Sequence, residues 1–499
     1  MIALILFLCL PLYSSARLEY LVYPTIIEER STAGNLALRI NDAITLNLER
    51  SDVLAERLLF VTATRDRHET ETVDTSSIRR KLYHDLNEQS SLMVDHTDGT
   101  LHVEGVVNSK LRIKPIPEGE RSAQGHVLHS LYEVEEIKAS FINIGAYSRY
   151  YPEADARRHQ VSSRNIQVIR PGSHHLSQAN RTTTTTTRRP VLEFTVEVHV
   201  ISDEEHNQNF ASEIQLILYI GVMINAVQLR FLGMRMPTIK FKLVGVTMSK
   251  SDTFASVILG TLEAYETINK LEEHYKQGYI PGNPDTVYLM TGRDVSSTKG
   301  EGLQKNVAGL ANVGGVCTVR RVALGEDVAL SYDGVYVMAH EIAHLLGARH
   351  DPTESGDCAW KLGFLMSYEE GGTNKYRLSS CSEASIRANV ARLSYICILQ
   401  MARVSISHVH ISGDMPGKKI SADRYCRLTY RRYLKSKRIS TKAYAAMPED
   451  LAEKCKMKCC YDNLRLTWCR TVDVLEGMTC VGERTCRRGI CANHTWAEK

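Results

Sequence analysis

The 499-residue chain has no cysteine between Cys9 and Cys317, no apolar run of 18 residues after its N-terminal stretch, and a net charge of only +4. A charge this small does not predict a nucleic-acid partner. The lack of such an apolar run predicts that the chain has no membrane anchor. Disulfides are therefore expected only in the part of the chain that begins at Cys317, where twelve cysteines lie.

The N-terminus carries a short apolar run, Ile2 to Tyr13, followed by the small residues Ser14-Ser15-Ala16. This pattern predicts a secretory signal peptide over residues 1–16, although the run is preceded by no Lys or Arg. A buried strand is the alternative. Removal of the peptide would take Cys9 with it and leave an even number of cysteines, which suits a secreted, extracellular protein with disulfide bonds.

The most informative motif is the complete H-E-x-x-H-x-x-G-x-x-H pattern formed by His340, Glu341, His344, Gly347 and His350. Two histidines four residues apart lie on one face of a helix and can bind the same Zn²⁺. The glycine permits a left-handed exit from the helix, which lets the third histidine reach the metal. The glutamate beside the first ligand can serve as general base toward a water activated by zinc.

The alternative to a metal site is an amphipathic core helix whose histidines are merely hydrogen bonded. Val335, Met338, Ile342 and Leu345 do form an apolar stripe, but largely on another face from the histidines. A core stripe requires neither the glycine nor the third histidine. The pattern therefore favours a catalytic zinc with three protein ligands and one open position.

With Asp351 directly after His350, the motif resembles the zinc signature of the metzincins and, within them, of the reprolysin (adamalysin) family. That family includes ADAM and ADAMTS enzymes, venom metalloproteinases and secreted salivary metalloproteases of ticks. Met366 fits the methionine of the metzincin Met-turn, and the segment 309–317 is similar to the stretch that precedes the active-site helix. The resemblance covers roughly residues 190–402.

The resemblance implies two disulfides around the zinc site, Cys317–Cys397 and Cys358–Cys381. The sequence alone allows three pairings of these four cysteines and 105 of the remaining eight, which are left unassigned. Some reprolysins also bind a structural Ca²⁺. The matching positions here are Glu197, Asp285 and Gln400, and the family usually has Asn at the last of these. Surface carboxylates that bind no metal are the equal alternative.

Residues 17–189 are expected to be a propeptide rich in β-strands, as in the alternating stretch 101–107. It has no cysteine to silence a zinc ion, so any inhibition would be steric or use another ligand. Its end carries a glycosylation sequon at Asn180 and six threonines, 182–187, which cannot bury surface and predict a linker. Arg188-Arg189 is a candidate processing point, and a passive linker is the alternative.

From residue 190 to 402 the pattern predicts an α/β (α+β) catalytic domain with a mixed sheet. Strands are expected at 194–201, 238–246 and 286–289, and helices at 213–232, 262–275 and 332–346. Ser212 and Gln215 form a candidate capping box at the first helix.

Residues 418–499 are expected to be a small domain held by disulfides, because eight cysteines lie there. Its end, 477–491, resembles the end of ADAMTS-type cysteine-rich modules, and Asn493 begins a second sequon. The stretch 418–442 has ten Lys or Arg and one acid, Asp423. Binding of glycosaminoglycans is one interpretation, and an ordinary solvated surface is the other.

Taken together, these residues predict a secreted zinc endopeptidase, made as a zymogen, that hydrolyses extracellular proteins such as matrix or clotting proteins. The alternative is a catalytically silent secreted protein that binds through the basic, cysteine-rich C-terminal domain. The intact histidines and glutamate argue against the alternative, because a silent copy has no chemical need of them.

Overall fold

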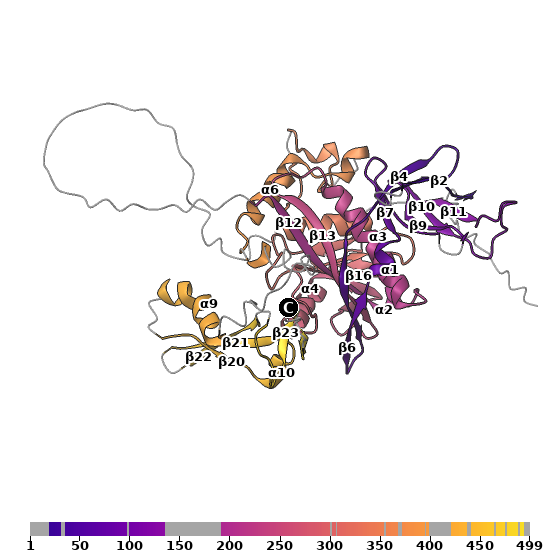
Figure 1. The fold of residues 1–499 in the computed structure, drawn as a ribbon. Coiled ribbons are helices and arrows are strands. Elements are labelled where there is room, and N and C mark those ends of the chain that lie inside the picture. Colours follow the sequence, from indigo (N-terminus) through magenta and orange to yellow (C-terminus); the bar gives the residue numbers. More distant parts are fainter. Residues whose placement is uncertain are drawn as a thin grey trace, which may run out of the picture.

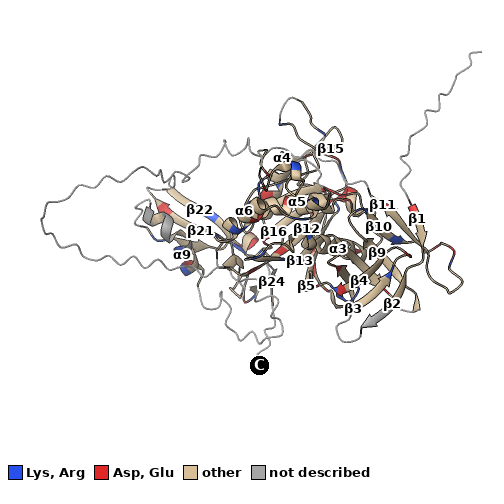
Figure 2. Ribbon diagram, turned by 90° about the horizontal axis from the view of Figure 1, so that it is seen from above, with Lys and Arg blue, Asp and Glu red and all other residues tan. Residues whose placement is uncertain are grey.

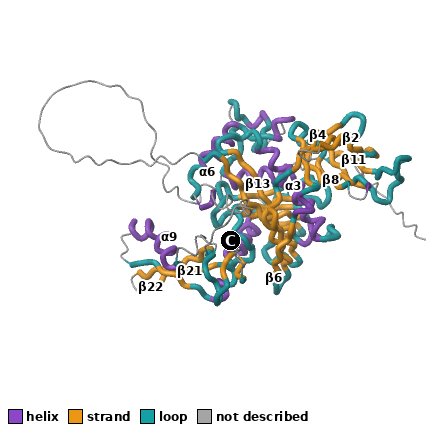
Figure 3. Tube along the Cα trace, viewed as in Figure 1, coloured by secondary structure: helices purple, strands orange, loops and turns teal. Residues whose placement is uncertain are grey.

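The computed structural model describes residues 19–30, 35–96, 99–134, 191–299, 302–305, 307–353, 356–367, 372–394, 396–398, 421–436, 441–463, 466–474, 477–487 and 490–493. The expected signal peptide, the threonine linker with Asn180, and Gln400 lie outside these residues. Figures 1 and 3 show three parts, which we call the N-terminal unit (19–134), the catalytic unit (191–398) and the C-terminal unit (421–493).

The N-terminal unit is built on one antiparallel sheet of nine strands, in the order β1-β11-β10-β9-β8-β7-β4-β3-β2. The bounds are β1 Glu19–Val22, β2 Thr25–Arg30, β3 Asn35–Arg39, β4 Thr45–Arg50, β7 Leu82–Asp85, β8 Ser90–Asp95, β9 His102–Val106, β10 Leu111–Pro115 and β11 His129–Glu133. Alternating side chains such as Leu36, Leu38, Leu46 and Leu48 fill its own core. The expected β-strand at 101–107 is β9.

A second, mixed sheet of seven strands runs through the catalytic unit in the order β18-β19-β16-β12-β13-β5-β6. The bounds are β5 Leu54–Ala63, β6 His68–Asp74, β12 Glu193–Ser202, β13 Thr238–Ser249, β16 Thr286–Thr291, β18 Gly309–Ala311 and β19 Val322–Glu326. The end strands β18 and β6 are antiparallel to their neighbours, and the other pairs are parallel. The predicted mixed sheet is confirmed, but two of its strands come from the N-terminal unit.

Helices cover this sheet. They are α2 Glu204–Asn207, α3 Glu213–Phe231, α4 Ala264–Lys276, α5 Val335–Leu346 and α6 Ser380–Val390, with the short α1 Ser76–Arg79 beside β6. As the capping prediction requires, Ser212 accepts a hydrogen bond from the backbone N–H of Gln215 at the start of α3. The Gln215 side chain accepts from Ala211 rather than from Ser212. Helices α3, α4 and α5 begin close to where the sequence predicts them.

Helix α3 is long and apolar enough to cross a membrane by length and composition, yet 78% of its most apolar window is buried inside the protein. A helix that is apolar on all sides belongs in a core. Here β13 lies on one side of α3, and strands β7, β8 and β9 of the N-terminal unit also contact it. Its composition is thus explained by burial within the protein.

Short elements complete the catalytic unit. A three-stranded sheet contains β14 Val257–Ile258, β15 Thr261–Glu263 and β17 Val295–Ser296, and the 3-10 helices η3 Trp360–Leu362 and η4 Gly372–Tyr376 follow α5. The smaller part after the zinc helix contains α6.

The C-terminal unit is small and cross-linked by four disulfides: Cys426–Cys459, Cys455–Cys486, Cys460–Cys469 and Cys480–Cys491. Its elements are α9 Ala422–Ser436, β20 Tyr444–Ala446, α10 Glu449–Ala452, β21 Lys456–Asn463, β22 Leu466–Asp473, β23 Thr485–Arg487 and β24 Ile490–Ala492. Half-cystines make up much of its core, as expected for a unit too small for a large apolar one.

Candidate metal centre and active site

Helix α5 carries the first part of the zinc motif. His340, Glu341 and His344 are all buried on it, and their helix packs against β18 and β19. The helix ends at Gly347, whose φ of 115° is a left-handed conformation that glycine adopts without a steric penalty. A Cβ there would lie 2.6 Å from the Cβ of Asn389, so the close packing of α6 against the helix end also requires glycine.

The chain turns after Gly347 and brings His350 back to the helix. Its Nε2 atom lies 3.1 Å from Nε2 of His340 and 3.2 Å from Nε2 of His344. Tetrahedral zinc with Zn–N bonds of about 2.0–2.1 Å needs its nitrogen ligands about 3.3 Å apart. Three imidazole nitrogens therefore converge at a spacing that fits one Zn²⁺, and among the described residues the three histidines form a group that could hold a metal ion.

Backbone carbonyls set the orientation of two of these rings. Nδ1 of His340 lies 2.8 Å from the carbonyl oxygen of Leu365, and Nδ1 of His344 lies 2.9 Å from that of Ala348. An N–H that donates to a carbonyl fixes the proton on Nδ1 and leaves the Nε2 lone pair for a metal. His340 and His344 thus have the tautomer that zinc requires.

Burial also keeps the histidines neutral. It lowers the pKa of His340 well below its usual value, the pKa of His344 to about 4 and that of His350 to about 3. For His340 and His350 the neighbouring imidazoles lower the pKa further. A neutral imidazole is the form that binds a metal ion.

The Glu341 carboxyl group is buried beside strand β18. It is 2% exposed, and its Oε2 atom has no hydrogen-bond partner among the described residues. Burial raises the pKa of Glu341 well above its usual value. Gly309 on β18 leaves room for this side chain, because a Cβ at residue 309 would lie 2.8 Å from the Glu341 Oε1 atom.

Met366 is buried in the turn whose Leu365 carbonyl faces His340. The carbonyl of Met366 accepts a hydrogen bond of 2.9 Å from the backbone N–H of Asp351. The Asp351 carboxylate in turn accepts from the hydroxyls of Ser379 and Ser382, at 2.6 and 3.2 Å. Asp351 thereby links the turn after the zinc motif to the start of α6.

The sequence did not single out several groups that support the site. The Leu365 and Ala348 carbonyls carry no sequence signal, because every residue has one. Asn389 donates from its side-chain amide to the Leu346 carbonyl at the end of α5, and one amide in an unremarkable helix gives no signal either.

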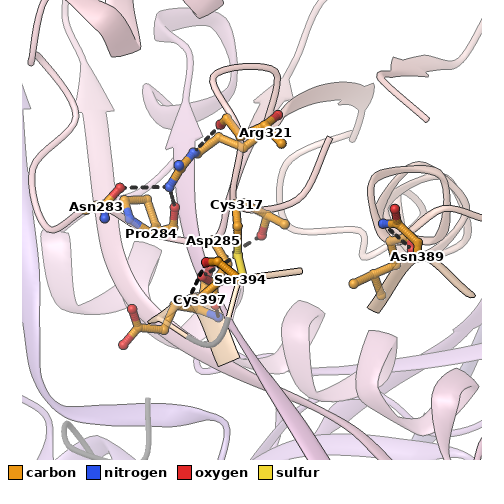
Figure 4. The surroundings of a disulfide bond; sticks show 12 residues. Asn283, Pro284, Asp285, Cys317, Arg321, Asn389, Ser394 and Cys397 are labelled. Carbon is orange, nitrogen blue, oxygen red and sulfur yellow. Dashed lines mark hydrogen bonds between the residues drawn. A yellow bond between two sulfur atoms is a disulfide. The ribbon is translucent and has the colours of Figure 1, made fainter. Parts of the chain in front are cut away.

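The structure pairs Cys317 with Cys397 and Cys358 with Cys381. Figure 4 shows the first of these bonds with Asp285 against it and the Arg321 guanidinium nearby. Arg321 donates to the Asn283 side chain at 2.9 Å and to the Pro284 carbonyl.

Of the three expected calcium ligands, Asp285 lies beside that disulfide and contacts the backbone of Glu197. Glu197 and Asp285 are both buried, so the interpretation as surface carboxylates is wrong. The Asp285 carboxylate accepts a hydrogen bond of 2.9 Å from the backbone N–H of Glu197. Burial raises the pKa of Asp285 to about 7. Gln400, the third expected position, lies outside the described residues.

The basic stretch 418–442 lies partly in α9, and several of its side chains fall outside the described ones. Arg424 and Arg427 are exposed there, whereas Asp423 accepts a hydrogen bond from the backbone of Ala445. Figure 2 shows basic and acidic residues scattered over the described ribbon. Asn493 is exposed near the end of β24.

Comparisons with known proteins find a known family over the segment that carries this site. The model of metallo-peptidase family M12, Reprolysin_5, matches residues 193–380, which include the whole zinc motif. A venom metalloproteinase of Tityus trivittatus, antarease-like TtrivMP_A, is 27% identical over 351 residues, which cover 66% of this chain and 82% of the relative. The venom metalloproteinase antarease TserMP_A of Tityus serrulatus is 26% identical over 411 residues, covering 77% and 94%.

Among solved structures, metalloproteinase-II from Bacteroides fragilis overlaps with 74% of this chain and 91% of its own, at 12% identity and a TM-score of 0.33. An overlap this loose carries no argument about function. The family model and the venom relatives, together with the three converging histidines, identify residues 193–380 as a reprolysin-type domain of metallo-peptidase family M12 and the chain as a zinc metalloendopeptidase.

Proposed function

We propose that this zinc metalloendopeptidase uses His340, His344 and His350 as its metal ligands and Glu341 as its general base. The observation that carries the proposal is the convergence of three Nε2 atoms 3.1 and 3.2 Å apart, with two of the rings held by carbonyls through Nδ1. When bound, Zn²⁺ supplies a Lewis acid that polarises the scissile carbonyl and lowers the pKa of water.

The protein groups have separate tasks in this proposal. Glu341 accepts a proton from the attacking water and later donates it to the leaving amine. The peptide bond then breaks with a neutral amine as the leaving group. Met366 supports the rings from below through packing and does not itself react.

The biological setting is also part of the proposal. The names of the relatives describe venom metalloproteinases, and the predicted signal peptide and six disulfides suit secretion into an oxidising compartment. We propose synthesis as a zymogen, with matrix or clotting proteins as the substrate class. The basic C-terminal unit would select substrates or bind sulfated glycosaminoglycans.

Calcium is a secondary proposal, at Glu197 and Asp285. Its test is the melting temperature of the zinc-loaded protein in Ca²⁺ and in a calcium-selective chelator. A binding site would raise the melting temperature with Ca²⁺ concentration, and an unchanged value would exclude the site.

The main test is cleavage of native and denatured matrix proteins by the purified enzyme, with and without a zinc chelator, alongside metal analysis. Cleavage that stops with chelator and returns with Zn²⁺ supports the proposal. Bound zinc without any cleavage would favour the alternative of a binding protein that acts through the C-terminal unit. Heparin affinity measured with and without residues 418–499 would then locate that activity.

A further inference from the structure

One side of helix α3 is covered by the N-terminal unit rather than by the catalytic unit to which the helix belongs. Leu54, Leu82 and Val106 of the N-terminal unit lie in the same apolar core as α3 and β13. At Gly221 on α3, a Cβ would meet the Leu54 side chain at 3.4 Å. Separation of the two units would leave this apolar surface in water.

A buried polar residue of α3 also contacts the N-terminal unit. Asn225 of α3 is fully buried, and its side-chain amide accepts from the hydroxyl of Ser51 at 2.7 Å. The same amide donates to the hydroxyl of Ser91 at 2.9 Å and to the Tyr83 carbonyl at 3.1 Å. All three partners belong to the N-terminal unit. A buried amide with such partners specifies that unit as its neighbour, because a misfit would leave polar groups unsatisfied.

The units also share a sheet. Strand β5 pairs in parallel with β13 from Leu54 opposite Leu243 to Ala63 opposite Ser249. The backbone N–H groups of Leu243 and Lys250 donate to the Val53 and Ala63 carbonyls, both at 2.7 Å. Without β5, this edge of β13 would expose a row of unpaired backbone groups.

A third contact lies at the loop before α5. The buried Arg112 guanidinium donates to the Tyr332 carbonyl at 3.3 Å, and the Tyr332 hydroxyl donates to Glu104 at 3.0 Å. Tyr332 itself is stacked on Tyr219 of α3. The N-terminal unit therefore also holds the segment that leads into the zinc helix.

The pairing of β5 with β13 lies at the other end of the sheet from the strand beside the active site. The added strands β5 and β6 form one end of the seven-stranded sheet, and β18, which packs against α5 and faces Glu341, forms the other. The N-terminal unit can thus stay on its edge of the sheet while the β18 edge receives a substrate.

We propose that the N-terminal unit, residues 19–134, remains bound to the catalytic unit after cleavage of the chain between them and is a permanent part of the mature enzyme. Within the expected propeptide, any inhibitory and removable part would then lie after residue 134. The inference rests on the proposed function only in expecting that such a cleavage occurs.

The test uses the full chain with Thr182–Thr187 replaced by the recognition sequence of a site-specific protease, and with a second such sequence between Glu135 and Glu136. The double cut separates residues 19–134 from both the intervening segment and the catalytic unit. Gel filtration and native mass spectrometry then measure whether the fragments stay together. We expect a one-to-one complex that separates only in denaturant. Fragments that separate in native buffer, with residues 191–499 still unfolding cooperatively, would overturn the proposal.

A zinc-directed hydroxamate distinguishes this docking from binding at the active site. Because none of the contacts described above involves Glu341 or the three histidines of the metal site, the complex should survive saturating hydroxamate. Release of the N-terminal unit by hydroxamate would overturn the proposal, since it would place the holding contact at the metal. The co-elution measurement requires neither zinc nor activity, so it stands even where the proposed catalysis fails.

The variant Asn225→Ala tests the interface without removing apolar area from the N-terminal unit. Loss of the amide removes the acceptor of the buried Ser51 hydroxyl and the donor to Ser91 and Tyr83, so dissociation of the cleaved complex should accelerate about tenfold or more. Lys240→Ala is the matched control on β13, because its exposed ion pair with Glu193 stays within the catalytic unit. Equal dissociation rates of the two variants would contradict the role of Asn225, and a faster rate for Asn225→Ala alone would support it.

Discussion

At the scale of single residues, the Glu341 carboxyl group carries the sharpest chemical prediction. Glu341→Gln keeps the side-chain volume beside Gly309 but cannot take up a proton as a carboxylate does. Peptidase activity should fall by about 10²–10⁴-fold or more. Zinc content, measured by metal analysis, should stay at one per chain, because the three histidines are unchanged.

The control is Glu266→Gln, a substitution of the same kind on the exposed start of α4. It should leave kcat/KM within about twofold of the wild type, as surface substitutions usually have small effects. Near-normal activity of Glu341→Gln would refute the assignment of the base.

His129 gives a prediction about pH. It is fully buried at the start of β11, where its Nε2 atom accepts from the Val103 N–H at 3.0 Å and its Nδ1 atom lies 2.9 Å from the Val127 carbonyl. Burial lowers its pKa from 6.5 to about 4. Between these values the unfolded chain binds the proton and the folded one does not, so stability falls as the pH drops from 6.5 towards 4, by about 3 kcal/mol at most.

Urea unfolding of the wild type and of His129→Gln at pH 7 and pH 4.5 measures this contribution. Glutamine can still accept from Val103 but does not titrate, so the variant should lose less stability on acidification. An equal loss in both proteins would show that other groups control the pH dependence.

The residues of the site differ in how far the sequence could predict them. His340, His344 and His350 stand out because the spacing of three scarce side chains is itself the signal, and the structure brings them together. The Leu365 and Ala348 carbonyls that orient the rings are backbone groups. They become visible only when the fold places residue 365 against residue 340.

At the scale of elements, the exit of α5 at Gly347 decides whether the third histidine reaches the other two. Gly347→Ala introduces a side chain at a φ of 115°, with its Cβ 2.6 Å from Asn389. The strain should cost about 1–3 kcal/mol. We expect weaker zinc retention in a competition with a chelator and a lower melting temperature.

Gly233→Ala is the matched control, because a Cβ there would have only the Glu383 side chain within reach, at 4.0 Å, and its φ is not positive. Its zinc retention should equal that of the wild type. If both variants retained zinc equally well, the left-handed exit would not be what positions His350.

The elements of the catalytic unit follow local patterns and were largely predictable. Strands β12, β13 and β16 and helices α3, α4 and α5 begin within a few residues of their expected positions. The pairing of β5 with β13 was not predictable, because an alternating pattern identifies a strand but not its neighbour. The one relevant signal was the apolar character of α3 on all sides, which implies a cover on each.

At the scale of the whole molecule, the C-terminal unit docks on the end of α4 through two lysines. Lys454 lies 4.4 Å from the centre of the Tyr279 ring, and Lys456 lies 4.6 Å from that of Tyr275. Replacement of both lysines by alanine should weaken this docking by about 1–2 kcal/mol. Faster hydrogen exchange at the end of α4 would report it, with unchanged cleavage of short peptides.

Lys458→Ala on the same strand is the control, because Lys458 is exposed. It should leave exchange at α4 as in the wild type. Unchanged exchange in the double variant would mean that the two lysines do not hold the C-terminal unit on the end of α4.

The pairing of β5 with β13 also orders events during synthesis. Residues 54–63 leave the ribosome long before their partner, residues 238–249, has been made. At about 5–20 residues per second, the nascent chain needs roughly 12 to 50 s to reach residue 249, and until then an edge with apolar side chains has no neighbour. A protein built this way needs its first half to be shielded while the second half is still being translated.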